Sequence, residues 1–264
     1  MKAQKLLNNY FGAGLAGADC LYPLKTETHF ISDLHLSLDK PEITRRFLHY
    51  LEKTAPKAQS LYILGDLFDA WIGDDDNTPP NKSIKQGLKQ LSEQGTQIFM
   101  IRGNRDFLLG ERFCQATGIH LLTDFARIEL DHQAILLTHG DLLCTDDVAY
   151  QAFREKSRQP EWQSNVLSKP LWLRLLAARW YRLRSHYHKR GKTQDIMDVN
   201  QLSVESVLRE NNCLCLIHGH THRPDQHSFL LDDKAAQRIV LSDWTKDRGA
   251  YLSWNGTQFS EHLI

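Results

Sequence analysis

Five short apolar segments of this chain each end in residues of the kinds that bind metal ions in proteins. In chain order, the residues that follow them are Asp33 and His35, then Asp66, Asn104 and His139, and finally His218 with His220. Continuous runs of four or five apolar residues rich in Ile and Leu predict strands that are covered on both faces. Such strands belong inside a layered fold, so these segments constrain the architecture more than any other feature.

Helix-compatible stretches separate these predicted strands. They include residues 42–55 (EITRRFLHYLEKTA) and residues 81–95 (NKSIKQGLKQLSEQG), the second of which ends on Gly95 as a helix C-cap would. The alternation of strand and helix predicts an α/β layered fold. Because ligand sites in such sheets lie beyond the carboxyl ends of the strands, we expect the five polar clusters to converge there.

Convergence would make a metal site. A single His at the end of a strand is more often a structural residue than a ligand, and the chain has 13 His to distribute. Five clusters at the same end of five apolar segments are harder to explain in that way. Carboxylate, amide and imidazole groups without a thiolate suit Mn²⁺ or a similar divalent ion, which ligand type alone does not separate from Mg²⁺ or Co²⁺.

The bulk composition narrows the function further. The 264 residues suffice for one large domain, and Lys+Arg and Asp+Glu are equal at 32 each, so no overall charge favours nucleic acid. Five Cys without a CxxC pair favour a reducing compartment. No apolar run reaches the ~18 residues of a membrane-spanning helix, and polar residues interrupt any signal-peptide core. Residues 1–27 are predicted to be an N-terminal extension of unknown role.

The ordered motifs DLH, GDLFD, GNRD, HGD and HGH resemble those of the calcineurin-like metallophosphoesterases. Longer stretches, such as GDLFDAWIGDDD, GDLLCTDDVAYQAFR and IMDVNQ, are similar to the UDP-2,3-diacylglucosamine pyrophosphohydrolases of lipid A biosynthesis. The resemblance runs from about His29 to the C-terminus. It implies a four-layer αββα sandwich over residues 28–264, with a helical lid inserted at about 150–195.

The resemblance also implies two Mn²⁺ ions per chain. One would be held by Asp33, His35, Asp66 and His220, and the other by Asp66, Asn104, His139 and His218. Asp66 would bridge the two, since a carboxylate has two oxygens for two cations. Asp69 and Asp141 could orient a ligand imidazole, or could equally be solvated turn acids. His222 has no ligand role in the pattern and is interpreted as structural or as a support to the ligands.

The implied reaction is hydrolysis of UDP-2,3-diacylglucosamine at the α-phosphorus, giving UMP and 2,3-diacylglucosamine 1-phosphate. Water activated by the two metal ions would be the nucleophile. The implied catalytic residues are Asp66, Asn104, Arg105 and His139. Many relatives in the wider superfamily have His in place of Arg105; a guanidinium cannot donate a proton near neutral pH but can clamp phosphate oxygens. This suits a pyrophosphate, whose leaving group needs little acid help.

The implied substrate contacts are Asn104, Arg105, Asp147, Ser185, Lys189, Lys192 and His218. The family commonly has Asn where this chain has Lys189. The three contacts from Ser185 to Lys192 fall in the long connection between the fourth and fifth strands, far longer than an ordinary loop. From Trp162 to Gln194 this connection has no Asp or Glu. It carries Lys169, Arg174, Arg179, Arg182, Arg184, Lys189, Arg190 and Lys192 among Trp, Leu and Tyr.

Three interpretations of this basic insert are open. It could be a helical hairpin with a solvated basic face, a surface for an anionic lipid or membrane, or, least favoured, a nucleic-acid surface. The family uses the insert as an acyl-chain lid, so the resemblance implies a cytoplasmic protein lying peripherally on the inner membrane, without an obligate protein partner. A metallophosphoesterase for soluble nucleotides, or a scaffold that is not an enzyme, are the alternative functions.

Overall fold

The computed structural model describes residues 27–189 and 198–264, and for residues 181–189 the backbone alone. The predicted extension at 1–27 therefore lies almost entirely outside the described residues, as do the side chains of Ser185, Lys189 and Lys192.

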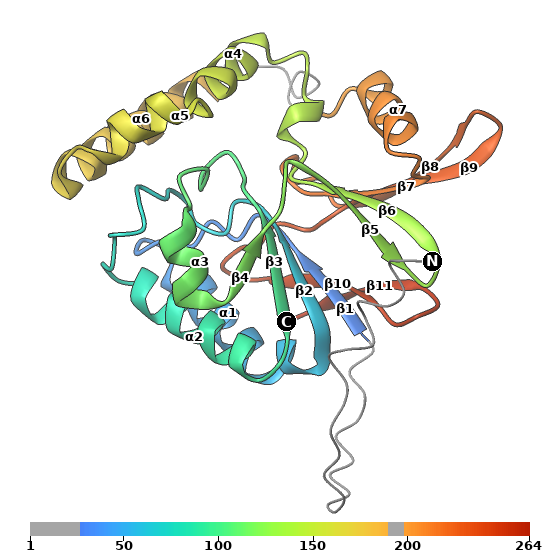
Figure 1. Cartoon of the computed structure of the whole chain (residues 1–264), viewed down its shortest axis with the longest axis horizontal. Coiled ribbons are helices and arrows are strands. Elements are labelled where there is room, and N and C mark those ends of the chain that lie inside the picture. The colour runs from blue at the N-terminus through green and yellow to red at the C-terminus, as the bar shows by residue number, and fades with distance from the viewer. Residues whose placement is uncertain (1–26, 190–197) are drawn as a thin grey trace, which may run out of the picture.

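Two sheets form the centre of the described chain (Figure 1). The first has the strand order β11–β10–β1–β2–β3–β4, and the second β5–β6–β7–β9–β8. The strands of the first sheet are β1 (Glu27–Ile31), β2 (Ala58–Leu64), β3 (Gln97–Ile101), β4 (Ile119–Leu121), β10 (Ala250–Trp254) and β11 (Phe259–Leu263). Those of the second are β5 (Phe125–Leu130), β6 (Gln133–Thr138), β7 (Cys215–His218), β8 (Asp225–Leu231) and β9 (Lys234–Val240). Strands β1 to β4 run parallel, and so do β6, β7 and β9.

Alternation along the strands explains why the apolar segments are continuous. In β2, Leu61 and Ile63 face the helices, whereas Tyr62 and Leu64 face the second sheet. Successive side chains of a strand point to opposite faces, so burial on both faces requires apolar residues at every position. Phe30 of β1 lies opposite Tyr62 in the parallel register and stacks on its ring.

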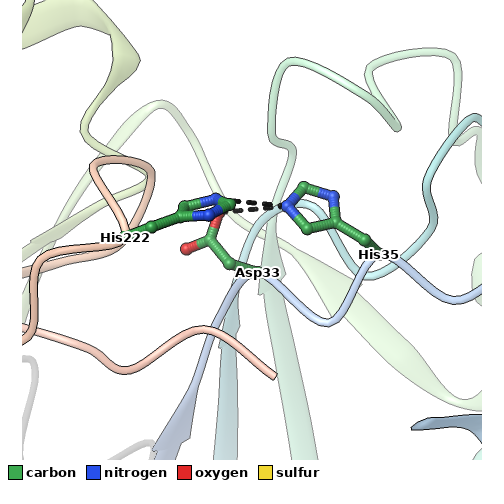
Figure 2. Close-up of side chains that lie close together, drawn as sticks. All are labelled: Asp33, His35 and His222. Carbon is green, nitrogen blue, oxygen red and sulfur yellow. Dashed lines mark hydrogen bonds and ion pairs between the residues drawn. The ribbon is translucent and has the colours of Figure 1, made fainter. Parts of the chain in front are cut away.

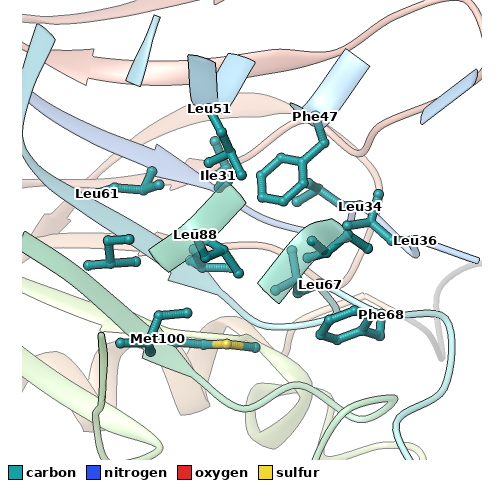
Figure 3. Packing of buried hydrophobic residues seen from close by; sticks show 14 of the residues in the cluster. Ile31, Leu34, Leu36, Phe47, Leu51, Leu61, Leu67, Phe68, Leu88 and Met100 are labelled. Carbon is teal, nitrogen blue, oxygen red and sulfur yellow. The ribbon is translucent and has the colours of Figure 1, made fainter. Parts of the chain in front are cut away.

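Helices cover the outer face of each sheet and complete four layers. On the first sheet lie α1 (Pro41–Lys53), α2 (Asn81–Glu93) and α3 (Glu111–Thr117), with a 3-10 turn η1 (Ala55–Lys57) before β2. Figure 3 shows part of the core between them, with Phe47 and Leu51 of α1 packed near Ile31 and Leu61. On the second sheet lies α7 (Gln201–Glu210), whose Val204 and Leu208 are buried. The αββα sandwich predicted from the sequence is confirmed.

Residues at the ends of the helices have the types that favour a helix start or stop. Helix α1 begins at Pro41 with Glu42 in its first turn, both favourable at a helix N-terminus. Helix α2 ends at Glu93, and Gly95 follows with a φ of 87°, the left-handed conformation that glycine adopts without strain.

The long connection after β6 is helical. The turn η2 (Asp141–Leu143) leads into α4 (Val148–Ser157), α5 (Pro160–Leu167) and α6 (Leu171–Lys189). These three helices extend over the end of the sandwich where β2, β3 and β6 finish (Figure 1). Among the described helices, none has the length and apolar character needed to cross a membrane. The helices lie above the carboxyl ends of the strands.

Candidate metal centre

The loops that follow β1, β2, β3, β6 and β7 bring their polar side chains to one end of the sandwich. The backbone there is strained at five residues other than glycine: Asp33, His35, Asp66, His220 and His222 have φ values of 56°, 49°, 51°, 71° and 55°. The left-handed region costs an L-residue about 1–2 kcal/mol. Such strain is typical of functional sites, where the surrounding structure holds side chains in one direction.

The first group of donor atoms comes from Asp33, His35 and His222 (Figure 2). The two Nε2 atoms lie 3.2 Å apart, and Asp33 Oδ1 lies 3.3 Å from His222 Nε2 and 3.9 Å from His35 Nε2. Asp33 Oδ1 and His35 Nδ1 are buried without a hydrogen-bond partner. Buried polar atoms normally have a hydrogen-bond partner. A carboxylate oxygen without one, facing two imidazoles, fits a site for a cation.

The other oxygen of Asp33 is fixed by the protein. Asp33 Oδ2 accepts hydrogen bonds from Ser32 Oγ at 2.7 Å and from the backbone N–H of His220 at 2.8 Å. The carboxylate is therefore oriented with Oδ1 toward the two imidazoles, as a preformed ligand would be.

The second group comes from Asn104, His139 and His220. Asn104 Oδ1 lies 3.0 Å from His139 Nε2 and 3.1 Å from His220 Nδ1. His139 Nδ1 donates to the carbonyl of Leu64 at 2.8 Å, which leaves Nε2 free to bind a metal when the ring is neutral. The carbonyl of Leu64 therefore orients the imidazole of His139, a role that the sequence suggested for Asp69 or Asp141.

Asp66 lies between the two groups. Its Oδ1 is 3.7 Å from His139 Nε2, and its Oδ2 is 3.8 Å from His35 Nδ1. Oδ1 also accepts the backbone N–H of Arg105 at 2.8 Å. Each oxygen faces a different group of nitrogen donors, which is the arrangement a bridging carboxylate needs. No side chain fits at Gly103, since a Cβ there would collide with Asp66 Oδ1.

His218 and His222 exchange the roles that the sequence predicted for them. His218 is the last residue of β7 and points to the same face as Leu216, which packs in the cluster under α7. Its Nδ1 donates to the carbonyl of Gly219 at 2.8 Å, and its Nε2 lies 3.3 Å from a nitrogen of Arg238. Both ring nitrogens of His218 are thus engaged within the protein, and the residue is fully buried.

Burial and neighbouring carboxylates set the charge of the imidazoles. Burial lowers the pKa of His35 and of His220 to about 3, so both are neutral at pH 7. Burial acts in the same direction on His139, but the carboxylates of Asp66 and Asp33 outweigh it and raise its pKa to about 9. Burial raises the pKa of Asp66 to about 6. Burial acts to lower the pKa of His222 as well, but its contact with Asp33 outweighs burial and raises it. The metal-free site therefore keeps the imidazole of His139 protonated beside two carboxylates.

Metal binding is consequently expected to release at least one proton per chain at pH 7, because a ligand His must be neutral. Protonated His139 competes with the cation, so affinity for the cation at His139 should rise about tenfold per pH unit below its pKa of about 9 and then level off. Calorimetric titration of Mn²⁺ in two buffers of different ionisation enthalpy measures the released protons. An affinity independent of pH between 6.5 and 8.5 would contradict this protonation state.

Asp106 is a contributor that the sequence did not single out. It is fully buried, and its carboxylate accepts the N–H of Leu67 at 2.8 Å and of Gly103 at 2.7 Å. These amides flank Asp66 and Asn104, so Asp106 ties the two ligand loops together. Burial and the nearby Asp66 raise its pKa to about 7. The signal in the sequence was an acidic residue at the end of the GNRD motif, next to Asn104 and Arg105.

The remaining predicted residues lie around this centre. The carboxylate of Asp141 accepts from Arg154 Nε at 2.8 Å and from the Tyr150 hydroxyl, so it joins the site to α4. Asp147 caps α4 by accepting the N–H of Tyr150 at 3.2 Å. Arg105 is partly buried in the loop after β3, where its backbone N–H binds Asp66. The backbone N–H of Asp69 donates to Leu36 O at 3.1 Å.

Carboxylate, amide and imidazole donors gathered at the carboxyl ends of parallel strands are the kind of set that holds divalent metal ions in a phosphoesterase. The family model of the calcineurin-like phosphoesterases matches residues 28–224, and the chain belongs to this family. Relatives named UDP-2,3-diacylglucosamine hydrolase are similar over most of their length. That of Aromatoleum aromaticum is 47% identical over 86% of this chain and 92% of its own. That of Chromohalobacter salexigens is 49% identical over 84% of this chain and 90% of its own. That of Aliivibrio fischeri is 46% identical over 88% of this chain and 96% of its own.

Proposed function

We propose that this chain hydrolyses the pyrophosphate of UDP-2,3-diacylglucosamine to UMP and 2,3-diacylglucosamine 1-phosphate. The names of relatives that are 46–49% identical over most of the chain support this substrate. The observation that carries the proposal is the convergence of two groups of metal donors on either side of Asp66, beneath a basic and apolar insert.

We propose two divalent ions, Mn²⁺ by ligand type, with a ligand set revised by the geometry. Asp33, His35, Asp66 and His222 would hold one ion, and Asp66, Asn104, His139 and His220 the other. When bound, the ions supply Lewis acidity that activates water and neutralises charge on the phosphoryl oxygens.

The residues of the chain then orient the substrate. Arg105 would clamp oxygens of the diphosphate, since its guanidinium offers a planar set of donors. Attack at the α-phosphorus forms a bond to the water oxygen and breaks the bond to the bridging oxygen. The leaving group, a sugar 1-phosphate, departs as an anion of low basicity. It therefore needs no protonated imidazole, which agrees with an arginine at position 105.

The insert would bind the acyl chains. Helix α6 has no acidic residue, and Trp172, Leu176 and Trp180 are 63%, 58% and 61% exposed. Exposed aromatic and aliphatic side chains beside basic ones suit a lipid with an anionic headgroup. On this ground we also propose a cytoplasmic protein that lies peripherally on the inner membrane. Asp147, Ser185, Lys189 and Lys192 remain proposed substrate contacts.

The test is release of UMP from UDP-2,3-diacylglucosamine dispersed in detergent. We expect turnover with Mn²⁺, loss of at least 90% of it after chelation, and recovery when Mn²⁺ is added back. Soluble UDP-N-acetylglucosamine and bis(p-nitrophenyl) phosphate serve as competing substrates. The proposal fails if the soluble compounds are cleaved efficiently and the lipid nucleotide is not, and a soluble phosphodiester would then be the substrate.

A further inference from the structure

Among the residues of helix α6 whose side chains are described, 171–180, the one buried residue is Arg174. Among residues 172–177 of this helix, Arg174 is 6% exposed, whereas every other residue is exposed. Burial of the charged residue and exposure of its apolar neighbours is the reverse of an ordinary amphipathic helix. The position of α6 over the core therefore depends on Arg174 rather than on apolar packing of this stretch.

The guanidinium of Arg174 is almost completely used in hydrogen bonds. Nη1 donates to the carbonyl of Ile72 and, at 2.8 Å, to Asp75 Oδ1, while Nη2 donates to Asp75 Oδ2. Nε donates to the carbonyl of Lys169 at 2.8 Å. A bidentate pair of this kind fixes direction as well as distance. It also lowers the pKa of Asp75, so the pair stays charged at neutral pH.

Gly73 makes the close approach possible. Its φ is 138°, and a Cβ at this position would collide with Nη1 of Arg174. Two features of the chain, a glycine with a left-handed backbone and a buried arginine about 100 residues later, thus fit one another.

The loop that receives Arg174 is itself rigidly attached. Asp74 accepts hydrogen bonds from the indole of Trp71 at 3.0 Å and from the N–H groups of Gly110 and Phe113 at 3.1 and 3.0 Å. The backbone N–H of Trp71 donates to the carbonyl of Arg105 at 2.9 Å. One short loop therefore connects the anchor of the insert with the residue proposed to clamp the diphosphate.

We propose that Arg174 is a positioning residue that, through Asp75 and Ile72, seats the insert at a fixed distance from the metal centre and so sets the affinity for the lipid substrate. The inference rests on the proposed function for the identity of the substrate. The attachment of the insert by Arg174 does not depend on that function. Arg174 does not touch the reacting atoms in this account; it holds the surface that binds the acyl chains.

The test uses Arg174→Gln, Asp75→Asn and the double variant, with Lys156→Gln, an exposed lysine on α4, as the matched control. Each single variant is expected to raise KM for the lipid nucleotide about tenfold, since a bidentate charged pair is lost, while kcat changes less than about twofold. The double variant should be no worse than the worse single one. Arg174→Lys keeps the positive charge but not the planar, two-pronged set of donors. Its KM should therefore lie between that of the wild type and that of Arg174→Gln.

Hydrogen exchange separates this inference from the proposed function. In both single variants the amides of residues 171–180 should exchange at least about tenfold faster, whereas those of β2 and β3 should not change. Unchanged exchange in α6, or effects of the two substitutions that simply add, would overturn the seating role. If the wild-type protein failed to cleave the lipid nucleotide, the proposed function would fall, and the exchange data would still decide whether Arg174 seats the insert.

Discussion

Asp66→Asn is expected to reduce turnover of UDP-2,3-diacylglucosamine by at least about 1000-fold, because residues that merely support metal ligands already cost ~10–100-fold when they are lost. The two oxygens of Asp66 face different groups of donors, His139 on one side and His35 on the other. An amide keeps the shape of the side chain but offers one neutral oxygen and an NH₂ group that repels a cation. One substitution should therefore weaken both metal positions.

The number of bound ions tests the cause of this loss. Elemental analysis after dialysis should find the Asp66→Asn protein depleted of metal, while Asp247→Asn, the same chemical change at an exposed loop residue, keeps both the metal and the activity. Removing the charge also relieves burial of an acid whose pKa is raised to about 6, so the metal-free variant should be no less stable than the wild type. Full metal content with full turnover would exclude Asp66 as the shared ligand.

The fold could be predicted from the sequence because burial on both faces leaves a clear pattern. The segment LYIL of β2 alternates between two cores, and each core requires an apolar residue. Helix α2 likewise ends beside Gly95, as its sequence indicates. These signals are local, and each is enforced by packing that admits few alternatives.

The choice between His218 and His222 could not be made in the same way. Leu216 and Ile217 are both fully buried, so the pattern does not tell which face of β7 is continuous with the site. The strand also extends one residue beyond its apolar segment and includes His218. His222 reaches Asp33 only because the backbone turns through left-handed conformations at His220 and at His222 itself. Such conformations are rare for non-glycine residues, so sequence gives no reason to expect them.

Asp106 and Arg174 were missed for a related reason. Both are charged residues whose partners are mainly backbone groups or a single acid distant in sequence. The sequence shows that a charge is present, but its partner appears only when the loops are folded. Arg174 stood among eight basic residues of the insert with nothing to mark it as the buried one.

The corrected ligand assignment predicts opposite results for two substitutions four residues apart. His222→Ala should weaken binding of one Mn²⁺ by at least about 100-fold and reduce turnover to a similar degree, because an imidazole that would bind the ion directly is lost rather than a group that supports a ligand. Its side chain is 40% exposed, so the thermal stability of the metal-free protein should hardly change.

His218→Ala should lower the stability of the protein and leave metal affinity nearly unchanged. Its imidazole is fully buried against Arg238, whose Nε already has no hydrogen-bond partner, so truncation should cost about 1–3 kcal/mol of unfolding free energy. Metal affinity should stay within a few-fold of wild type, as it should for His132→Ala, an exposed histidine on the turn between β5 and β6. Calorimetry with and without Mn²⁺ measures both quantities for each variant. If His218→Ala lost the metal and His222→Ala kept it, the imidazole at the end of β7 would be the ligand after all, and the orientation of its ring toward Arg238 would not describe the metal-bound protein.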